Sequence, residues 1–96
     1  MKRDTLIERR RREILEISQK HGAFNVRIFG SVSRSENDAL SDIDILVDVE
    51  KGKSLFDLGE LSIELEELLG CRVDIVTAKG LRKRIRDKIL KEAIPL

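Results

Sequence analysis

Two carboxylates stand two residues apart in the middle of the sequence, at Asp42 and Asp44. Apolar residues alternate with them and predict a strand over residues 42–49, in which both carboxylates project from the same face. Like charges held that close repel each other, and a divalent cation relieves the repulsion. Mg²⁺ suits the position because it needs few protein carboxylates and takes its other ligands from water and substrate phosphate. The alternative is a solvated strand edge, where acidic side chains oppose aggregation.

A third carboxylate, Asp74, lies between two apolar residues in another predicted strand, residues 72–77. If the two strands are neighbours, Asp74 can join the face that carries Asp42 and Asp44. Three converging carboxylates can hold two Mg²⁺ ions roughly 3.5–4 Å apart, the geometry used to displace nucleotidyl and phosphoryl groups. An isolated surface aspartate is the competing interpretation.

A glycine–serine pair, Gly30-Ser31, follows a predicted strand over residues 24–29. Glycine permits close backbone approach to a ligand, and the Ser31 amide and hydroxyl can bind phosphate oxygens. Arg34 lies three residues further on and can supply a positive charge to the same phosphate. Alone, such a pair is usually a turn and such an arginine a solvated side chain, so the phosphate interpretation depends on the carboxylates that follow.

The segment 30–47, GSVSRSENDALSDIDILV, resembles the signature of the minimal nucleotidyltransferases (MNT family) of the polymerase-beta-like superfamily. In that family a Gly-Ser pair and an arginine precede a short spacer, Ser-Asp-x-Asp and an apolar run. The matching residues here are Gly30, Ser31, Arg34, Ser41, Asp42 and Asp44. Ser33 and Ser35 stand where Ala and Gly are commoner, which changes the loop without removing a catalytic group. The resemblance extends weakly to both ends of the chain, through the third aspartate and the basic last helix.

The resemblance also implies a role for each of these residues. It implies that the nucleotide phosphates are held by Gly30, Ser31 and Arg34. It implies that Asp42 and Asp44 bind Mg²⁺, and that Asp74 completes the metal site and accepts the proton of an attacking hydroxyl. The implied reaction transfers a nucleoside monophosphate from ATP to that hydroxyl, with pyrophosphate as the leaving group.

The elements that must position these residues alternate along the chain. Hydrophobic periodicity predicts helices over residues 5–21, 54–69 and 81–93, and residues 31–40 could hold a short one. Capping-box patterns at Thr5 with Glu8 and at Ser54 with Asp57 begin the first two of these helices. The order α-β-α-β-α-β-α predicts an α/β fold, a small mixed β-sheet covered by helices, that uses residues 1–96 as one domain. The resemblance implies that this domain is nucleotidyltransferase-like.

The composition narrows the class of protein. Of the residues, 41% are apolar and 39% are charged, which excludes a disordered chain and leaves no apolar run long enough for a membrane span. The net charge of +1 divides into +5 for residues 1–35, −9 for 36–67 and +5 for 68–96. A single cysteine, Cys71, excludes an intramolecular disulfide and a cysteine-based zinc site. We expect a soluble cytoplasmic protein without a membrane partner, in which His21 and Cys71 are structural.

A chain of 96 residues has little room for a domain that binds the acceptor of the reaction. We therefore expect the acceptor to be bound by a partner, or to be the partner. Small proteins of the MNT family are commonly the antitoxin half of a toxin–antitoxin pair. The resemblance implies that the partner is a HEPN-domain ribonuclease, held in a hetero-oligomer and silenced when AMP is added to one of its tyrosines.

Other interpretations stay open. The chain could be an antitoxin that acts by stoichiometric binding, or a nucleotidyltransferase of a small molecule. Six basic side chains line the last predicted helix and could attract phosphate, dock an acidic partner or be solvated: Arg82, Lys83, Arg84, Arg86, Lys88 and Lys91. The chain has three Phe and no Trp or Tyr, so it offers few aromatic side chains on which bases could stack. We therefore do not expect independent nucleic-acid binding. The apolar tail, residues 94–96, is either a contact strand or a frayed terminus.

Overall fold

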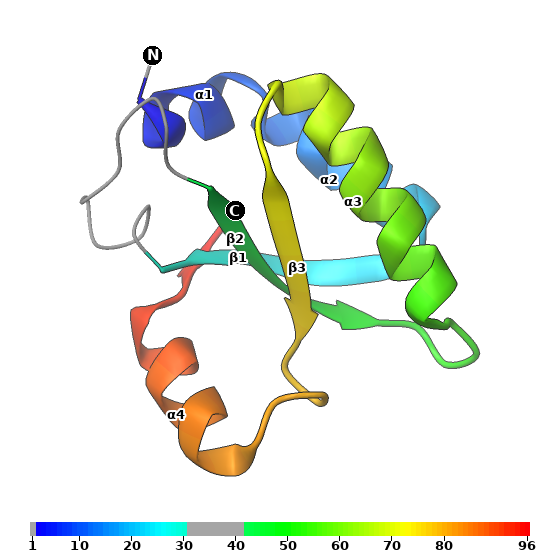
Figure 1. Cartoon of the computed structure of the whole chain (residues 1–96), viewed down its shortest axis with the longest axis vertical. Helices are drawn as coiled ribbons and strands as arrows, with labels where there is room; N and C mark the ends of the chain where they lie inside the picture. Colours follow the sequence, from blue (N-terminus) through cyan, green and yellow to red (C-terminus); the bar gives the residue numbers. More distant parts are fainter. Residues whose placement is uncertain (1, 31–41) are drawn as a thin grey trace.

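A four-stranded mixed sheet in the order β3-β2-β1-β4 forms the centre of the fold in the computed structural model (Figure 1). The structure describes residues 2–30 and 42–96. Their elements are α1 (Arg3–Arg9), α2 (Arg11–Lys20), β1 (Ala23–Phe29), β2 (Ile43–Val49), α3 (Leu55–Leu69), β3 (Val73–Thr77), α4 (Lys83–Glu92) and β4 (Ile94–Pro95). The predicted mixed α/β sheet is confirmed, and the short helix considered between residues 31 and 40 lies outside the described residues.

Strand β2 is the centre of the sheet. It pairs antiparallel with β1 and parallel with β3, so the predicted adjacency of the two aspartate-bearing strands is confirmed. Ile43, Ile45 and Val47 are fully buried and join the core beneath α2 and α3. The residues between them, beginning with Asp44, therefore face the opposite side of the sheet.

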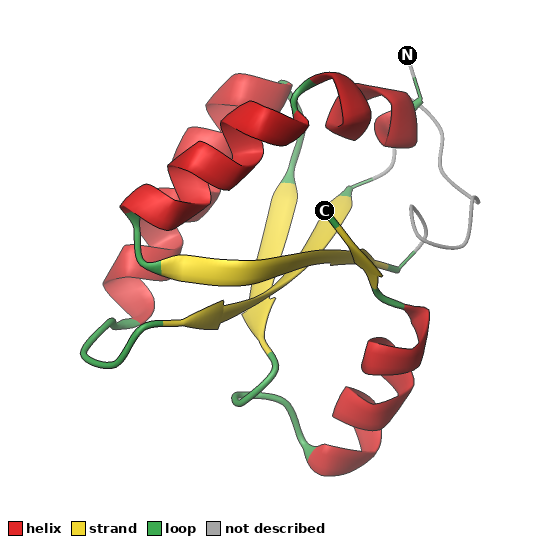
Figure 2. Cartoon of the chain, turned by 180° about the vertical axis from the view of Figure 1, so that it is seen from behind, coloured by secondary structure: helices red, strands yellow, loops and turns green. Residues whose placement is uncertain are grey.

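The helices lie on different sides of this sheet. α2 packs on β1 and on α3, and α3 packs on β3. α4 lies apart from the other helices, across the sheet (Figures 1 and 2). The carboxylate face of β2 thus opens toward the side on which α4 stands.

The first predicted helix is in fact two helices, because the chain breaks at Arg10, which caps both α1 and α2. The four arginines at residues 9–12 are all exposed. In one continuous helix four consecutive residues would fan over about 300°, which would turn one of them toward the core. The predicted capping box at Thr5 and Glu8 is wrong, since α1 begins at Arg3 and its N-cap, Lys2, makes no side-chain cap bond.

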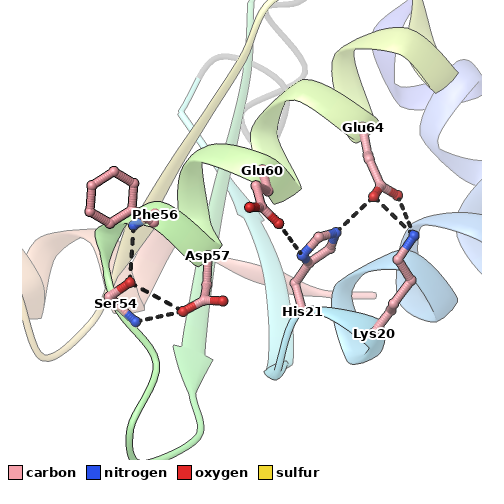
Figure 3. A network of polar contacts seen from close by, with 7 residues as sticks. All are labelled: Lys20, His21, Ser54, Phe56, Asp57, Glu60 and Glu64. Carbon is pink, nitrogen blue, oxygen red and sulfur yellow. Dashed lines mark hydrogen bonds and ion pairs between the residues drawn. The ribbon is translucent and has the colours of Figure 1, made fainter.

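Helix α3 has the caps that the sequence predicts. Ser54 Oγ accepts a hydrogen bond from the Phe56 amide at 3.2 Å, and the Asp57 carboxylate accepts one from the Ser54 amide at 2.8 Å (Figure 3). Gly70 closes the helix in the left-handed region, at φ 70°. These caps set both ends of α3. They thereby set the position after Gly70 at which β3 begins, and with it the position of Asp74.

The apolar tail is a contact strand rather than a frayed end. β4 pairs antiparallel with β1, with Ile94 opposite Ile28, and the Leu96 amide donates to the Val26 carbonyl at 3.0 Å. The pairing anchors the C-terminal end of α4 beside the end of β1. None of the helices within residues 2–30 and 42–96 is long and apolar enough to cross a membrane.

His21 and Cys71 both have structural surroundings, as expected. His21 is only 9% exposed, and its Nε2 lies 2.9 Å from Glu64 Oε1 and its Nδ1 3.9 Å from Glu60 (Figure 3). Lys20 Nζ reaches the same Glu64 carboxylate at 2.9 Å, so the end of α2 is tied to α3. Cys71 packs against the core, and burial raises the pKa of its thiol.

This tie predicts an acid-sensitive contribution to stability. Hydrogen bonds from Lys20 and His21 lower the pKa of Glu64. A carboxylate with a lowered pKa stabilises the fold above its unfolded pKa of about 4.3 and stops doing so as the pH falls through its folded pKa. Glu64→Gln should therefore reduce the free energy of unfolding at pH 7, and the difference from the parent should shrink below about pH 4.3. Urea unfolding at several pH values measures it.

The matched control is Glu67→Gln, an exposed residue on the same helix. It should change stability little at any pH. A deficit in the Glu64 variant that is the same at pH 7 and at pH 3 would contradict the proposed tie.

Candidate active site

Asp44 and Asp74 lie side by side on neighbouring strands. They are direct Cα partners in the parallel pairing of β2 with β3, and paired residues project from the same face of a sheet. Asp44 is half-buried and Asp74 is exposed. Parallel pairing thus brings together two carboxylates that are thirty positions apart in the sequence, on the side of the sheet away from the core.

Asp42 is not part of the strand pairing that aligns Asp44 with Asp74. It immediately precedes β2 and is exposed, two residues before Asp44. Within residues 2–30 and 42–96, no three His, Cys, Asp or Glu side chains form a ready-made metal-binding group. Asp44 and Asp74 are therefore aligned as predicted, whereas a convergence of all three carboxylates is not seen among the described residues.

The donor chemistry of this face fits a hard divalent cation. Asp42, Asp44 and Asp74 offer carboxylate oxygens, and Mg²⁺ is commonly held by one or two carboxylates together with water and substrate phosphates. Asp48, further along β2, has a structural role instead. It pairs with Arg27 at 3.2 Å and accepts a hydrogen bond from the Asn25 amide group at 2.9 Å.

Gly30 fits closely against the Asp44 side chain. Its φ of +75° lies in the left-handed region, and a Cβ placed on it would overlap Asp44 Oδ2. The pairing of Phe29 with Asp44 places the next residue, Gly30, close to that carboxylate. We expected Gly30 to let the backbone come close to a ligand. In the structure the backbone at Gly30 comes close to Asp44, a proposed metal ligand.

Two predicted phosphate-binding residues, Ser31 and Arg34, lie outside the described residues, and their roles stay predictions. The structure adds a groove that sequence reasoning missed. The groove has a volume of about 410 Å³ and is lined by Phe29, Gly30, Arg84, Ile85, Lys88, Ile89 and Glu92. The sequence shows α4 as a basic helix with an apolar stripe, but nothing in it places that helix next to Gly30.

The sequence matches the family model of the nucleotidyltransferase domain over residues 10–96. It is 48% identical over 84 residues to a candidate protein adenylyltransferase of Methanocaldococcus jannaschii, a match that covers 88% of this chain and 90% of the relative. It is 40% identical over 79 residues to the protein adenylyltransferase MntA of Thermococcus cleftensis, covering 82% of this chain and 80% of the relative.

Solved structures share the fold. A candidate minimal nucleotidyltransferase superposes with a TM-score of 0.88 at 47% identity, over 97% of this chain and 95% of that one. A toxin–antitoxin crystal structure with AMP-PNP superposes with a TM-score of 0.77 at 21% identity, over 88% of this chain and 69% of that one. The second likeness, at this low identity, concerns the fold alone. The expected nucleotidyltransferase-like fold is confirmed.

The contact of Gly30 with Asp44 predicts a specific coupling in stability. Gly30→Ala should cost roughly 1–2 kcal/mol for the left-handed backbone and roughly 1–3 kcal/mol more for crowding Asp44. Gly70→Ala is the matched control, because it has φ +70° but open space around the added Cβ, so it should show the backbone cost alone.

The double-mutant cycle isolates the crowding. In an Asp44→Ala background the obstructing carboxylate is gone, so Gly30→Ala should cost no more than Gly70→Ala does. Urea unfolding of the single and double variants gives the coupling energy. Strictly additive effects of the Gly30 and Asp44 substitutions would refute the close approach.

Proposed function

The chain belongs to the nucleotidyltransferase domain family, and from that premise we propose that it transfers AMP from ATP to a hydroxyl group of a partner protein. The observation that carries the proposal is the alignment of Asp44 with Asp74 directly beside the Gly30 turn. A relative at 48% identity is named a candidate protein adenylyltransferase, and one at 40% identity is named a protein adenylyltransferase. These names support a protein as the acceptor.

In the proposed reaction the three carboxylates share the cations, and one of them also accepts a proton. Asp42, Asp44 and Asp74 would hold two Mg²⁺ ions, which when bound neutralise charge on the transferring and leaving phosphates. The acceptor oxygen bonds to the α-phosphorus, the bond to pyrophosphate breaks, and the hydroxyl proton passes to Asp74. Asp74 suits this task because it is exposed, where an acceptor from outside can reach it.

Gly30 and the residues after it complete the proposed nucleotide site. The turn at Gly30 presses the backbone against the Asp44 side chain, so phosphates held at this turn would lie next to the carboxylates. We propose that Ser31 and Arg34 bind these phosphates, as in the family signature. Held in this way, the α-phosphorus is in position for in-line attack, and positioning can account for much of the rate.

We further propose that the acceptor is a tyrosine of a HEPN-domain ribonuclease and that the chain is its antitoxin in a cytoplasmic hetero-oligomer. The support is the resemblance of residues 30–47 to the MNT signature and the relative named MntA. A non-catalytic antitoxin that acts by stoichiometric binding is the second candidate. The observation in its favour is α4, which buries none of its residues and leaves Ile85 48% exposed.

One prediction from the proposed function concerns the transfer of AMP itself. When the purified chain is incubated with ATP, Mg²⁺ and the protein encoded by the adjacent reading frame, intact-mass spectrometry should show that protein gaining one AMP or more. Asp74→Asn should slow the transfer about 100-fold or more, because the proton acceptor is lost. Glu67→Gln, an exposed carboxylate on α3, is the control and should transfer at the parent rate.

A partner that stays unmodified while the chain demonstrably binds ATP would overturn the enzymatic proposal. The stoichiometric alternative has its own readout in cells. It requires that a folded Asp42→Ala, Asp44→Ala double variant still protects against the partner, whereas the enzymatic proposal requires that protection is lost.

A further prediction from the proposed function concerns the cation. Mg²⁺ at a hundredfold excess over its Kd should stabilise the chain by about 2.7 kcal/mol, seen as a higher Tm. Asp74→Asn should remove this response without destabilising the Mg²⁺-free protein, because it also removes the repulsion from Asp44. Asp87→Asn, an exposed position on α4, should keep the response. An undiminished Mg²⁺ effect in the Asp74 variant would exclude this carboxylate as a ligand.

A further inference from the structure

The groove between the end of β1 and α4, called here the α4 groove, adjoins the carboxylate site at Gly30. Its lining includes Gly30, and a Cβ placed on Gly30 would overlap Asp44 Oδ2. The pairing of Ile28 with Ile94 holds the C-terminal end of α4 next to the end of β1 (Figure 1). Its volume of about 410 Å³ lies within the range of roughly 300–1,000 Å³ found for small-molecule sites.

One wall of the α4 groove carries two cations at helical spacing. Arg84 and Lys88 are four residues apart, so they project from the same face of α4, and both are exposed. Neither forms an ion pair within the described part of the chain, whereas Arg10 and Arg12 are already paired with glutamates of α2. Lys88 and Arg84 are therefore available to an anion from solution.

The groove is also apolar. Phe29, Ile85 and Ile89 line it together with the two cations, and Ile85 leaves 48% of its surface exposed. Covering such surface is favourable at about 25 cal/mol per Å². Glu92 lines the groove one turn beyond Lys88, which leaves the lining with a formal charge of +1. An occupant that matches this wall has an anionic part and a flat apolar part.

We propose that the α4 groove binds the nucleotide, with Arg84 and Lys88 on its phosphate chain and the apolar wall against its nucleoside. The inference rests on the proposed function and deepens it by naming the residues that position the substrate. A nucleoside triphosphate matches both halves of the lining. The apolar wall of Phe29, Ile85 and Ile89 favours it over an acidic peptide, because a ligand recognised by negative charge alone leaves that wall uncovered, whereas a nucleoside covers it.

The test separates the two halves of the ligand. Calorimetry at low ionic strength with Mg²⁺ measures the binding of ATP, inorganic triphosphate and adenosine to the parent and to an Arg84→Ala, Lys88→Ala double variant. The double variant should lose about tenfold or more in affinity for ATP and for triphosphate, the effect of roughly 1.4 kcal/mol, and should bind adenosine as the parent does.

Two further variants control the experiment. Lys83→Ala removes a cation from the same helix, at a position that does not line the groove, and should leave the affinity for triphosphate within about twofold of the parent. Ile85→Ala should weaken adenosine binding about threefold or more and leave triphosphate binding unchanged. Ile85 is exposed and α4 buries no residue, so these variants should fold as the parent does.

The outcomes distinguish this inference from the proposed function. Transfer of AMP with an unchanged KM for ATP in the double variant would overturn the inference and leave the function standing. A second outcome is that the parent binds triphosphate, the double variant does not, and no partner is modified. This outcome would support nucleotide binding in the α4 groove and count against the proposed function. An equal loss of affinity in the Lys83 variant would also overturn the inference, since it would show only the general positive charge of α4.

Discussion

Everything at the candidate site depends on the register of β2. One face of the strand is fully buried against the helices, through Ile43, Ile45 and Val47. This burial decides that the residues between them point to the opposite face. A slip of one residue would exchange the faces and drive Asp44 into the core, at the cost of burying a charge in an apolar environment. The apolar side of the strand thus holds the carboxylates in place on the other side.

The two neighbours of β2 use that register in different ways. Parallel pairing with β3 sets Asp74 beside Asp44, and antiparallel pairing with β1 brings the chain over Asp44 at Gly30. The first arrangement brings like charges together, and the second leaves no room for a side chain. Neither arrangement stabilises the fold by itself, and both fit the proposed site for a cation and nucleotide phosphates. The core under α2 and α3 offsets these local costs.

The fold follows from the sequence where local chemistry is decisive. The cap of α3 at Ser54 was predictable because it involves residues three apart, and the strand through Asp44 because its alternation is strict. The break at Arg10 was not, because it depends on keeping neighbouring arginines off the core, a constraint that appears only when the helix packs on a sheet. The pairing of the tail with β1 likewise depends on a strand distant in sequence.

The sequence by itself determined the kind of chemistry. The spacing of Asp42 and Asp44, the Gly-Ser pair before them and their likeness to the MNT signature are properties of a short segment, readable without knowing how the chain folds. Only the tertiary structure decided that Asp74 is the partner of Asp44 and that Lys88 lines the same groove as Gly30. These proximities arise from strand pairing and from the anchoring of α4 through β4. Such long-range contacts are selected by the burial of the whole core, and no local pattern encodes them.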